Sequence, residues 1–387
     1  MIHNDLYYFD LKINGQTIDI LENDLDFQIH DSVNCFYNNA ILNFNDVSGS
    51  LREFLLFSEG VEYELSFGFK DNFLRCKYTV DSDDTKEQTK LGTISLPTKL
   101  SLVNSFFKKE EIKSEAYNKK ISEIVSDIFS SENFKKNIET TSSKAIWYRP
   151  LQTQKEFIEM LCKKANPYGE NTPYYCFFNC DNSFNFVSYE NMLNQQEVTT
   201  LYQFPQADSG INLSTVYEIK EFKQGSLKTK PYWNRRVFSR DVSTGEYKET
   251  ICKMSDYPKK SNYSIPIIFD NRTITGYIDT GNKEDKTYNT AMINYGLKNT
   301  FFLERFVVTT IFNPNLMSGK KINLETKYSP NLVDLEKANY ISGEYLIEDC
   351  IHIWDNKARR ATTQIIIGRK FAKIPSNYKI KKGLINV

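Results

Sequence analysis

The stretch FFLERFVVTTIFNPNLMSGKKINLE, residues 301–325, decides how the rest of the chain is interpreted. Its first half is rich in aromatic and β-branched residues, which favour a strand, and its last residues begin another strand-like run. Pro314 and Gly319 lie at the bend between them, and Gly319 is expected to need a positive φ. Because the bend contains no His, no Cys and no acidic pair, we expect a structural turn rather than a reactive loop.

Strand patterns extend outward from this turn to both ends of the chain. Near the N-terminus, Asn14-Gly15 lies between two alternating runs, which is a strong signal for a β-hairpin. Short segments with a period of two continue to about residue 105. Near the C-terminus, GEYLIEDCIHIW and RATTQIIIGRKF flank the polar segment DNKAR and predict a second hairpin. We therefore expect a mainly β protein, with a first β domain over residues 1–105.

The middle of the chain changes period. One helical face is formed by Ile121, Ile124, Val125, Ile128 and Phe129. A second helix should begin after Thr153, because Thr153 and Glu156 fit a capping box. An aromatic hairpin around residues 173–188 follows, so residues 106–203 are expected to form a small α/β insert. Residues 241–299 are rich in turn-forming and charged residues and predict an irregular peripheral insert, with one helix over NTAMINYGLKNTFF, residues 289–302.

Composition limits the possible functions. The 387 residues contain 49 Lys+Arg and 49 Asp+Glu, and this zero formal net charge argues against DNA as the main ligand. The seven cysteines lack the regular spacing of a disulfide scaffold and are expected to be free thiols in a reducing compartment. The N-terminal residues do not resemble a secretory signal, and no apolar run approaches the roughly 18 residues that span a bilayer. Synthesis and folding in a cytoplasm are expected.

Residues that could carry chemistry are few. His352 alternates with Cys350 and Trp354 on one face of the last hairpin and is expected to be a partly buried sheet histidine. Cys176 and Cys180 are expected to be core thiols, because strand geometry would separate them by roughly 13 Å.

Neither carboxylates nor glycines suggest an enzyme. Glu348 and Asp349 are adjacent in a strand, so they should point to opposite faces. No glycine-rich phosphate loop is present. The sequence thus predicts no catalytic, cofactor or metal site and a protein that is not an enzyme.

The clustered basic residues and the C-terminal tail each allow two interpretations. Lysines and arginines gather at Lys223, Lys228, Lys230, Arg235, Arg236, Arg359, Arg360 and Arg369. They form either solvated strands or a charged surface for an acidic protein or for passing DNA. The tail at 373–387 is either a frayed terminus or an extended segment that adds to a partner's sheet.

The order of elements resembles a known family. The first β domain is followed by SLVNSFFKKEEIKSEAYNKKISEIVSDIF, the KEFIEML helix, SYENMLNQQEV, and the C-terminal NPNLMSGKKINLE and YISGEYLIEDCIHIWDNKARRATTQIIIGRK. Within these lie a Pro-x-Leu-x-x-Gly-x-x-Ile turn that includes Pro314 and Gly319, and a Gly-x-Tyr-x-Ile motif that begins at Gly343. Together they resemble the baseplate central hub protein of contractile-tailed phages of the T-even type, over nearly the whole chain.

The resemblance implies a virion protein of the tail baseplate, assembled in the host cytoplasm. It implies a homotrimer in which each subunit carries two β-barrels like those of the tail tube, at 1–105 and at 204–240 plus 300–372. Its implied partners are the central spike, the tail tube, the tape-measure protein and neighbouring baseplate proteins, with DNA only in transit and no membrane insertion. Pro314, Gly319 and Gly343 would be structural turn residues.

Two functions of other classes remain open from the sequence. A tail-associated cell-wall hydrolase would need a pair of carboxylates, for which Glu348 and Glu344 are the candidates. A carbohydrate-binding β module would present exposed aromatic platforms and need no trimer.

Overall fold

The structure of the protein is a computed structural model. It describes the following residues: 7–18, 25–46, 60–69, 72–85, 88–90, 93–142, 144–167, 172–203, 214–221, 234–241, 244–252, 273–280, 298, 304–326, 341–358 and 360–369.

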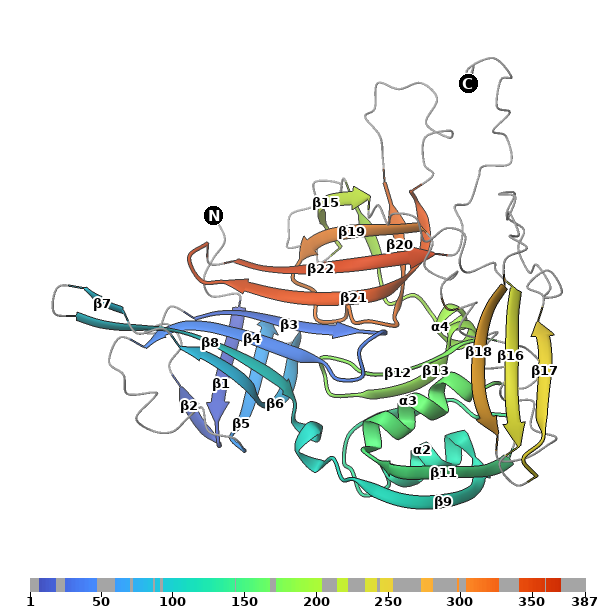
Figure 1. Ribbon diagram of the computed structural model, residues 1–387. Coiled ribbons are helices and arrows are strands. Elements are labelled where there is room, and N and C mark those ends of the chain that lie inside the picture. The colour runs from blue at the N-terminus through green and yellow to red at the C-terminus, as the bar shows by residue number, and fades with distance from the viewer. Residues whose placement is uncertain are drawn as a thin grey trace, which may run out of the picture.

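Most strands of the described residues belong to one sheet of 14 strands, which confirms the mainly β prediction (Figure 1). Its strands lie in the spatial order β15 (Val216–Glu221), β19 (Glu304–Ile311), β22 (Arg360–Arg369), β21 (Gly343–Asp355), β3 (Asp26–Ser32), β4 (Asn39–Asp46), β8 (Thr93–Asn104), β6 (Asn72–Thr85), β5 (Glu62–Phe69), β1 (Tyr7–Ile13) and β2 (Gln16–Ile18). Attached to this path are β14 (Thr200–Tyr202), which pairs with β20 (Lys321–Glu325), and β7 (Gln88–Lys90), which pairs with β8. β20 also pairs with β21.

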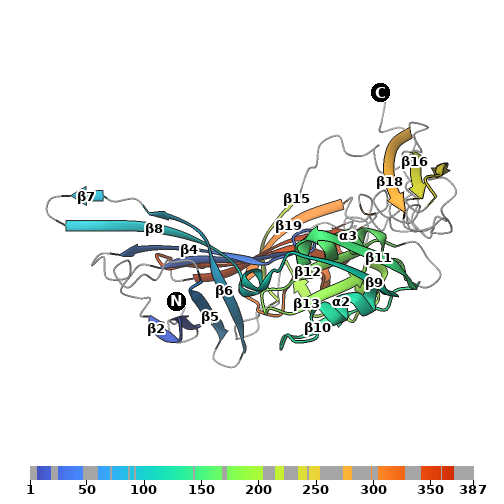
Figure 2. The ribbon, with the colours of Figure 1, turned by 60° about the horizontal axis from the view of Figure 1, so that its bottom comes forward.

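Local sequence accounts for the hairpins of this sheet. Asn14 and Gly15 have φ of 47° and 81°, the left-handed geometry of a tight hairpin turn, and they join β1 to β2. The hairpin predicted at the C-terminus is β21 paired with β22. β6 and β8 extend past their neighbours as a long two-stranded arm, at the opposite end of the molecule from the helices (Figure 2).

The two ends of the chain meet in the middle of the sheet. β3 and β21 are antiparallel neighbours, from Ser32 opposite Asp349 to Phe27 opposite Trp354. The β segments that the sequence divides between two barrels therefore share one continuous sheet. Their closure into two tube-like barrels stays a prediction.

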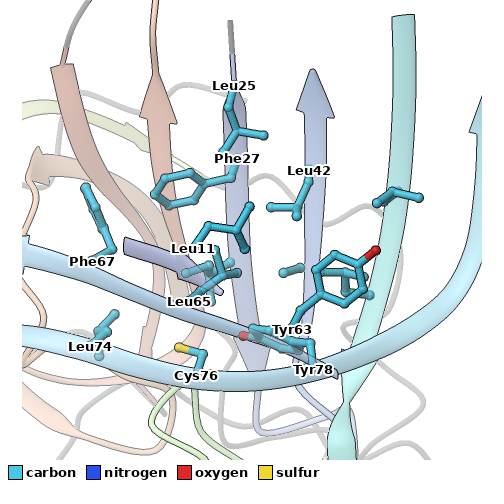
Figure 3. Close-up of a cluster of buried hydrophobic side chains, with 14 of the residues drawn as sticks. Leu11, Leu25, Phe27, Leu42, Tyr63, Leu65, Phe67, Leu74, Cys76 and Tyr78 are labelled. Atoms are coloured by element: carbon cyan, nitrogen blue, oxygen red, sulfur yellow. The ribbon is translucent and has the colours of Figure 1, made fainter. Parts of the chain in front are cut away.

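Two apolar clusters cover this sheet. The first consists mainly of side chains from β1, β3–β6 and β8, some of which Figure 3 shows. It also takes in Phe312 from the opening stretch, whose ring centroid lies 4.4 Å from that of Phe67. The second contains the inward side chains of β19–β22, among them Val308, Ile347 and Ile365. Each buried large apolar side chain stabilises the fold by about 1.5–3 kcal/mol, so the Phe67–Phe312 contact attaches the turn to the N-terminal strands.

The α/β elements expected between the β segments are present. A ribbon of β9 (Lys113–Lys120) and β11 (Lys144–Gln152) covers α2 (Ile121–Ile128) and α3 (Gln154–Lys164) on one side. On the other side lie β10 (Lys136–Ile138), β13 (Phe184–Ser188) and β12 (Tyr174–Phe178). The short η2 (Ser105–Lys109) and α4 (Tyr189–Asn194) flank this region.

The predicted capping box begins α3. Thr153 Oγ1 accepts a hydrogen bond from Glu156 N–H at 3.2 Å, and Glu156 Oε2 accepts one from Thr153 N–H at 3.0 Å. The start of this helix is therefore determined by four consecutive residues.

A fourth, small sheet contains β17 (Tyr247–Cys252), β16 (Asn234–Asp241) and β18 (Thr273–Thr280). β16 runs from the predicted second barrel, which ends at residue 240, into the predicted peripheral insert, which begins at residue 241. Of the helix expected at 289–302 only Lys298 is described, and it is helical. The tail at 373–387 lies outside the described residues. Among the helices that the structure does describe, none is long and apolar enough to cross a membrane.

Candidate functional site

The turn of the opening stretch contains two of the three predicted turn residues. Pro314 is buried, and Gly319 has φ +76°, as expected from the sequence. The N–H of Gly319 donates to the carbonyl of Ile347 at 2.8 Å, which joins the turn to β21. A Cβ atom on Gly319 would lie 2.6 Å from Phe177 Cζ, closer than real Cβ contacts allow. This turn thus packs directly on β12 of the insert.

Gly343 lies elsewhere, at the start of β21 and opposite Leu324 of β20. Its φ is +134°, and a Cβ there would lie 3.1 Å from Arg369 Nη1. That guanidinium donates through the same Nη1 to the carbonyl of Ser342 at 3.1 Å, and its Nε pairs with Glu304 at 2.6 Å. Gly343 therefore belongs to a separate contact at the far end of the β20–β21 pair.

A buried carboxylate connects the turn to two distant segments. Asp31, near the end of β3, is 1% exposed. Its Oδ2 accepts hydrogen bonds from Cys180 N–H at 2.8 Å and from Asn179 Nδ2 at 3.3 Å, and its Oδ1 accepts one from Ser318 N–H at 3.0 Å. Burial raises the pKa of Asp31 above its ordinary value, while the bonds from Cys180 and Ser318 oppose that shift. One side chain thereby joins β3, the β12–β13 turn and the turn at 313–320.

Asparagines complete this junction. Asn179 Nδ2 donates to the carbonyl of Ser318 at 2.9 Å, and Asn179 Oδ1 accepts from Asn185 Nδ2 at 2.6 Å. Asn104 Nδ2, at the end of β8, donates to Asn38 Oδ1 at 2.8 Å and to Asn182 Oδ1 at 3.0 Å. We call this set of seven residues the polar junction. Its members are Asp31, Ser318 and the asparagines Asn38, Asn104, Asn179, Asn182 and Asn185. Buried polar groups that satisfy one another specify a single arrangement, so the polar junction determines how the insert sits on the sheet.

The carboxylates considered for a hydrolase are placed apart. Glu348 is buried and forms two contacts with Arg305, Nε at 2.5 Å and Nη2 at 2.8 Å, and accepts from Asn34 Nδ2 at 2.9 Å. Burial raises the pKa of Glu348, and the Arg305 charge lowers it. Glu344 is exposed and pairs with Lys321 at 2.9 Å. Four strand residues span roughly 13 Å, so Glu344 and Glu348 do not form a catalytic pair.

The histidine of the last hairpin is more deeply buried than the sequence suggests. His352 is 0% exposed, whereas partial burial was expected. Its Nδ1 lies 2.9 Å from Thr363 Oγ1, and its Nε2 lies 3.6 Å from Cys350 Sγ. Burial lowers the pKa of His352 to about 3, because the charged imidazolium would be desolvated. A neutral imidazole without access to solvent is a structural group rather than a base.

The predicted core thiols are free, and they lie in different clusters. Cys176 packs against the core of the insert, and Cys180 belongs to the cluster of the N-terminal strands. β12 ends at Phe178, so the distance expected from a continuous strand does not apply to this pair. Across the residues that the structure places, no three His, Cys, Asp or Glu side chains are grouped so as to hold a metal ion.

The basic residues do not form one surface among the described side chains. Arg369 is 8% exposed and pairs with Glu304, and Arg236 is exposed and pairs with Glu249 at 3.1 Å. Lys223, Lys228, Lys230 and Arg359 lie outside the described residues.

Sequence reasoning missed the polar junction. It assigned Asn179 to Asn182 only a tight turn and did not consider Asp31. The one local signal is the positive φ of Asn182, 59°, in the β12–β13 turn. Asparagine tolerates that conformation better than most residues.

No protein-family model matches the sequence, and no curated protein matches it. Two solved structures resemble the fold over almost its whole length. The tail protein from Neisseria meningitidis MC58 superposes with a TM-score of 0.56 at 9% identity, covering 94% of this chain and 96% of that one. The 43 kDa tail protein of prophage MuSo2 from Shewanella oneidensis gives 0.56 at 11% identity, covering 94% and 98%. The chain has the fold of phage tail proteins.

This tail-protein fold confirms, at the level of architecture, the resemblance to baseplate proteins that the sequence suggested. At 9% and 11% identity the likeness is one of backbone arrangement. Within this fold, the polar junction connects the insert to the main sheet.

Proposed function

We propose that the chain is a structural hub protein of a phage-type tail baseplate and not an enzyme. It would form a homotrimer that adapts the threefold central spike to the sixfold tail tube and lines the channel for DNA and the tape-measure protein. It would assemble in the host cytoplasm and reside in the virion. The observation that carries the proposal is the tail-protein fold, which extends over 94% of the chain.

The sheet architecture supports two barrels in each subunit. The N-terminal strands contribute the side chains of one apolar cluster and β19–β22 contribute those of another, so two similar β units would alternate around a ring of three subunits. In this proposal residues 1–105 form the first barrel, and β15 with β19–β22 form the second. β16 belongs with the peripheral insert, because it pairs with β17 and β18.

Rigid placement of the insert fits a scaffold. Asp31 and the asparagines of the polar junction hold three segments together without exposing a reactive group. Neighbouring baseplate proteins would then meet an insert at a defined angle to the ring. Pro314, Gly319 and Gly343 would act as structural turn residues at two ends of β20.

The native mass of the purified chain tests the proposal. Light scattering should give about 136 kDa, three times the 45.2 kDa of one chain, and electron microscopy should then show a ring with a central channel. A chain that stays monomeric when mixed with the spike and tube proteins of the same tail would refute the trimeric hub.

The alternatives predict other outcomes in the same preparation. A monomer with measurable glycan affinity would indicate a carbohydrate-binding module. Cell-wall degradation that disappears in both Glu344→Gln and Glu348→Gln variants would indicate a hydrolase.

A further inference from the structure

The outer face of the β9–β11 ribbon is apolar and uncovered among the described residues. Its inner side chains, such as Trp147, pack on the helices, whereas Ile146 and Tyr148 of β11 point outward and are 53% and 59% exposed. Their cross-strand neighbours on β9 are Asn118 and Ala116. In Figure 1 the ribbon forms the margin of the insert, beyond α2 and α3.

A β-bulge in β11 exposes a further apolar side chain. The register of β11 shifts between Arg149 and Gln152, and Leu151 within the shift has φ +28° and is 76% exposed. A positive φ is costly for a branched, bulky residue, and bulges often redirect a side chain toward a partner. Ile112, just before β9, is 66% exposed. We call Ile112, Ile146, Tyr148 and Leu151 the ribbon patch.

A buried arginine holds the edges of the ribbon patch in place. The Arg149 side chain is 2% exposed, and its Nε and Nη2 donate to the carbonyl of Gln152 at 3.0 and 2.9 Å. Nη2 also donates to the carbonyl of Glu111. These carbonyls belong to the residues next to Leu151 and Ile112, so a single guanidinium fixes the backbone beside both exposed residues. The ribbon patch is therefore preorganised, which lowers the entropic cost of binding.

The row of Ile146 and Tyr148 carries positive charge at one end. Strand alternation places Lys144 in the row of Ile146 and Tyr148, with Lys120 directly across on β9. Glu115 and Asp127 interact with residues of the inner face, since Glu115 lies 3.9 Å from Arg149 and Asp127 pairs with Lys119 at 2.5 Å, while Glu123 Oε2 accepts a hydrogen bond from the Lys120 N–H at 3.0 Å. Lys144 is exposed. A complementary surface would be apolar along the ribbon and acidic at the Lys144 end.

The backbone of the ribbon also favours an extended partner. Within the described part of the chain, β9 and β11 pair only with each other, so each presents one unpaired strand edge. Such edges accept a further strand from another protein, and the side chains of the added strand alternate into the face beside it.

We propose that the ribbon patch and the adjacent edge of β11 bind an extended segment of a different protein, with apolar side chains in alternate positions and carboxylates that reach Lys144. The inference stands apart from the proposed hub function, because it concerns only the insert and can be tested on the purified chain.

A synthetic peptide of alternating isoleucine and threonine that ends in two glutamates serves as the probe. The matched control peptide ends in two lysines. Binding to the full chain is measured by fluorescence anisotropy. We expect the acidic peptide to bind about tenfold or more tightly than the control, and Lys144→Glu should reverse that preference. The double variant Ile146→Ser with Tyr148→Ser should lose binding while its melting temperature stays within the error of wild type, because both side chains point to solvent.

Other outcomes would overturn the proposal. These are equal binding of the two peptides, binding that the double variant retains, or no binding of either peptide. Two further results would assign the face to another occupant: a native mass that falls in the double variant would make it a contact between copies of this chain, and Tyr148-dependent binding to vesicles of neutral and anionic lipid would make it a lipid surface. A chain that fails to trimerise but shows the charge-dependent peptide binding would refute the hub and leave this proposal standing.

Discussion

Replacing Gly319 with alanine tests the turn that the sequence singles out. Gly319 has φ +76°, and the left-handed conformation costs a residue with a Cβ about 1–2 kcal/mol. The added Cβ would also lie 2.6 Å from Phe177 Cζ, and overpacking of this kind costs about 1–3 kcal/mol. Because the hydrogen bond from residue 319 to Ile347 survives in alanine, these two contributions decide the result. We expect Gly319→Ala to lower the free energy of unfolding by about 2–5 kcal/mol.

Gly15 supplies a matched control. Its φ is +81°, but a Cβ there meets no atom within 4 Å. Gly15→Ala should therefore lose only the conformational contribution, about 1–2 kcal/mol. The difference between the two variants measures the contact between the turn and the insert.

Urea unfolding of wild type and both variants, followed by circular dichroism and tryptophan fluorescence, gives the comparison. A chain of this size need not unfold in one step, so the transition that shifts has to be the same for both probes. Replacing Phe177 with leucine in the Gly319→Ala background should recover part of the loss, because it relieves the overlap. Equal losses at Gly15 and Gly319 would refute the contact with Phe177, and no loss at Gly319 would refute the positive φ.

Three further predictions concern buried polar groups. Arg305→Met should destabilise the fold by about 3–5 kcal/mol because it leaves Glu348 buried without its partner, and the Arg305→Met, Glu348→Leu double variant should recover most of that loss in urea unfolding; equal losses would contradict this. The pKa of His352 is lowered to about 3, so the unfolded chain binds a proton that the folded chain rejects, and the free energy of unfolding should fall as pH falls from about 6.5 toward 3. His352→Asn should flatten this pH dependence, and an unchanged slope would show that another group causes it. Asp31→Ala leaves the N–H groups of Cys180 and Ser318 unsatisfied at about 1–3 kcal/mol each, so its melting temperature should fall well below that of Asp31→Asn, which keeps one acceptor; a wild-type melting temperature for Asp31→Ala would rule out the polar junction as a source of stability.

Local features were predictable because their determinants lie within a few residues. Asn14-Gly15 produces a hairpin through its own backbone geometry, and Thr153 with Glu156 begins α3 through two reciprocal hydrogen bonds. Gly319 likewise adopts the positive φ that its place in a tight turn suggested. In each case a short stretch of sequence contains both the donor and the acceptor, or the glycine and the turn.

Contacts between distant segments were not predictable. Asp31 and Ser318 are separated by 287 positions, and nothing in either local sequence indicates the other. The pairing of β3 with β21 is of the same kind, since many strands in this chain have a similar alternation and could be neighbours. The bulge at the exposed Leu151 is held by the buried Arg149, which the composition of the insert does not reveal.

The amino-acid sequence alone determined that this protein is mainly β, that an α/β segment interrupts it, and where its hairpins and capped helix begin, because these properties follow from side-chain periodicity and backbone preferences over fewer than about 15 residues. The tertiary structure alone decided that both ends of the chain share one sheet, that Asp31 joins three segments, and that the ribbon patch is left facing outward. Those outcomes depend on which of several compatible surfaces come together, and that choice is made by burial and hydrogen bonding across the whole chain.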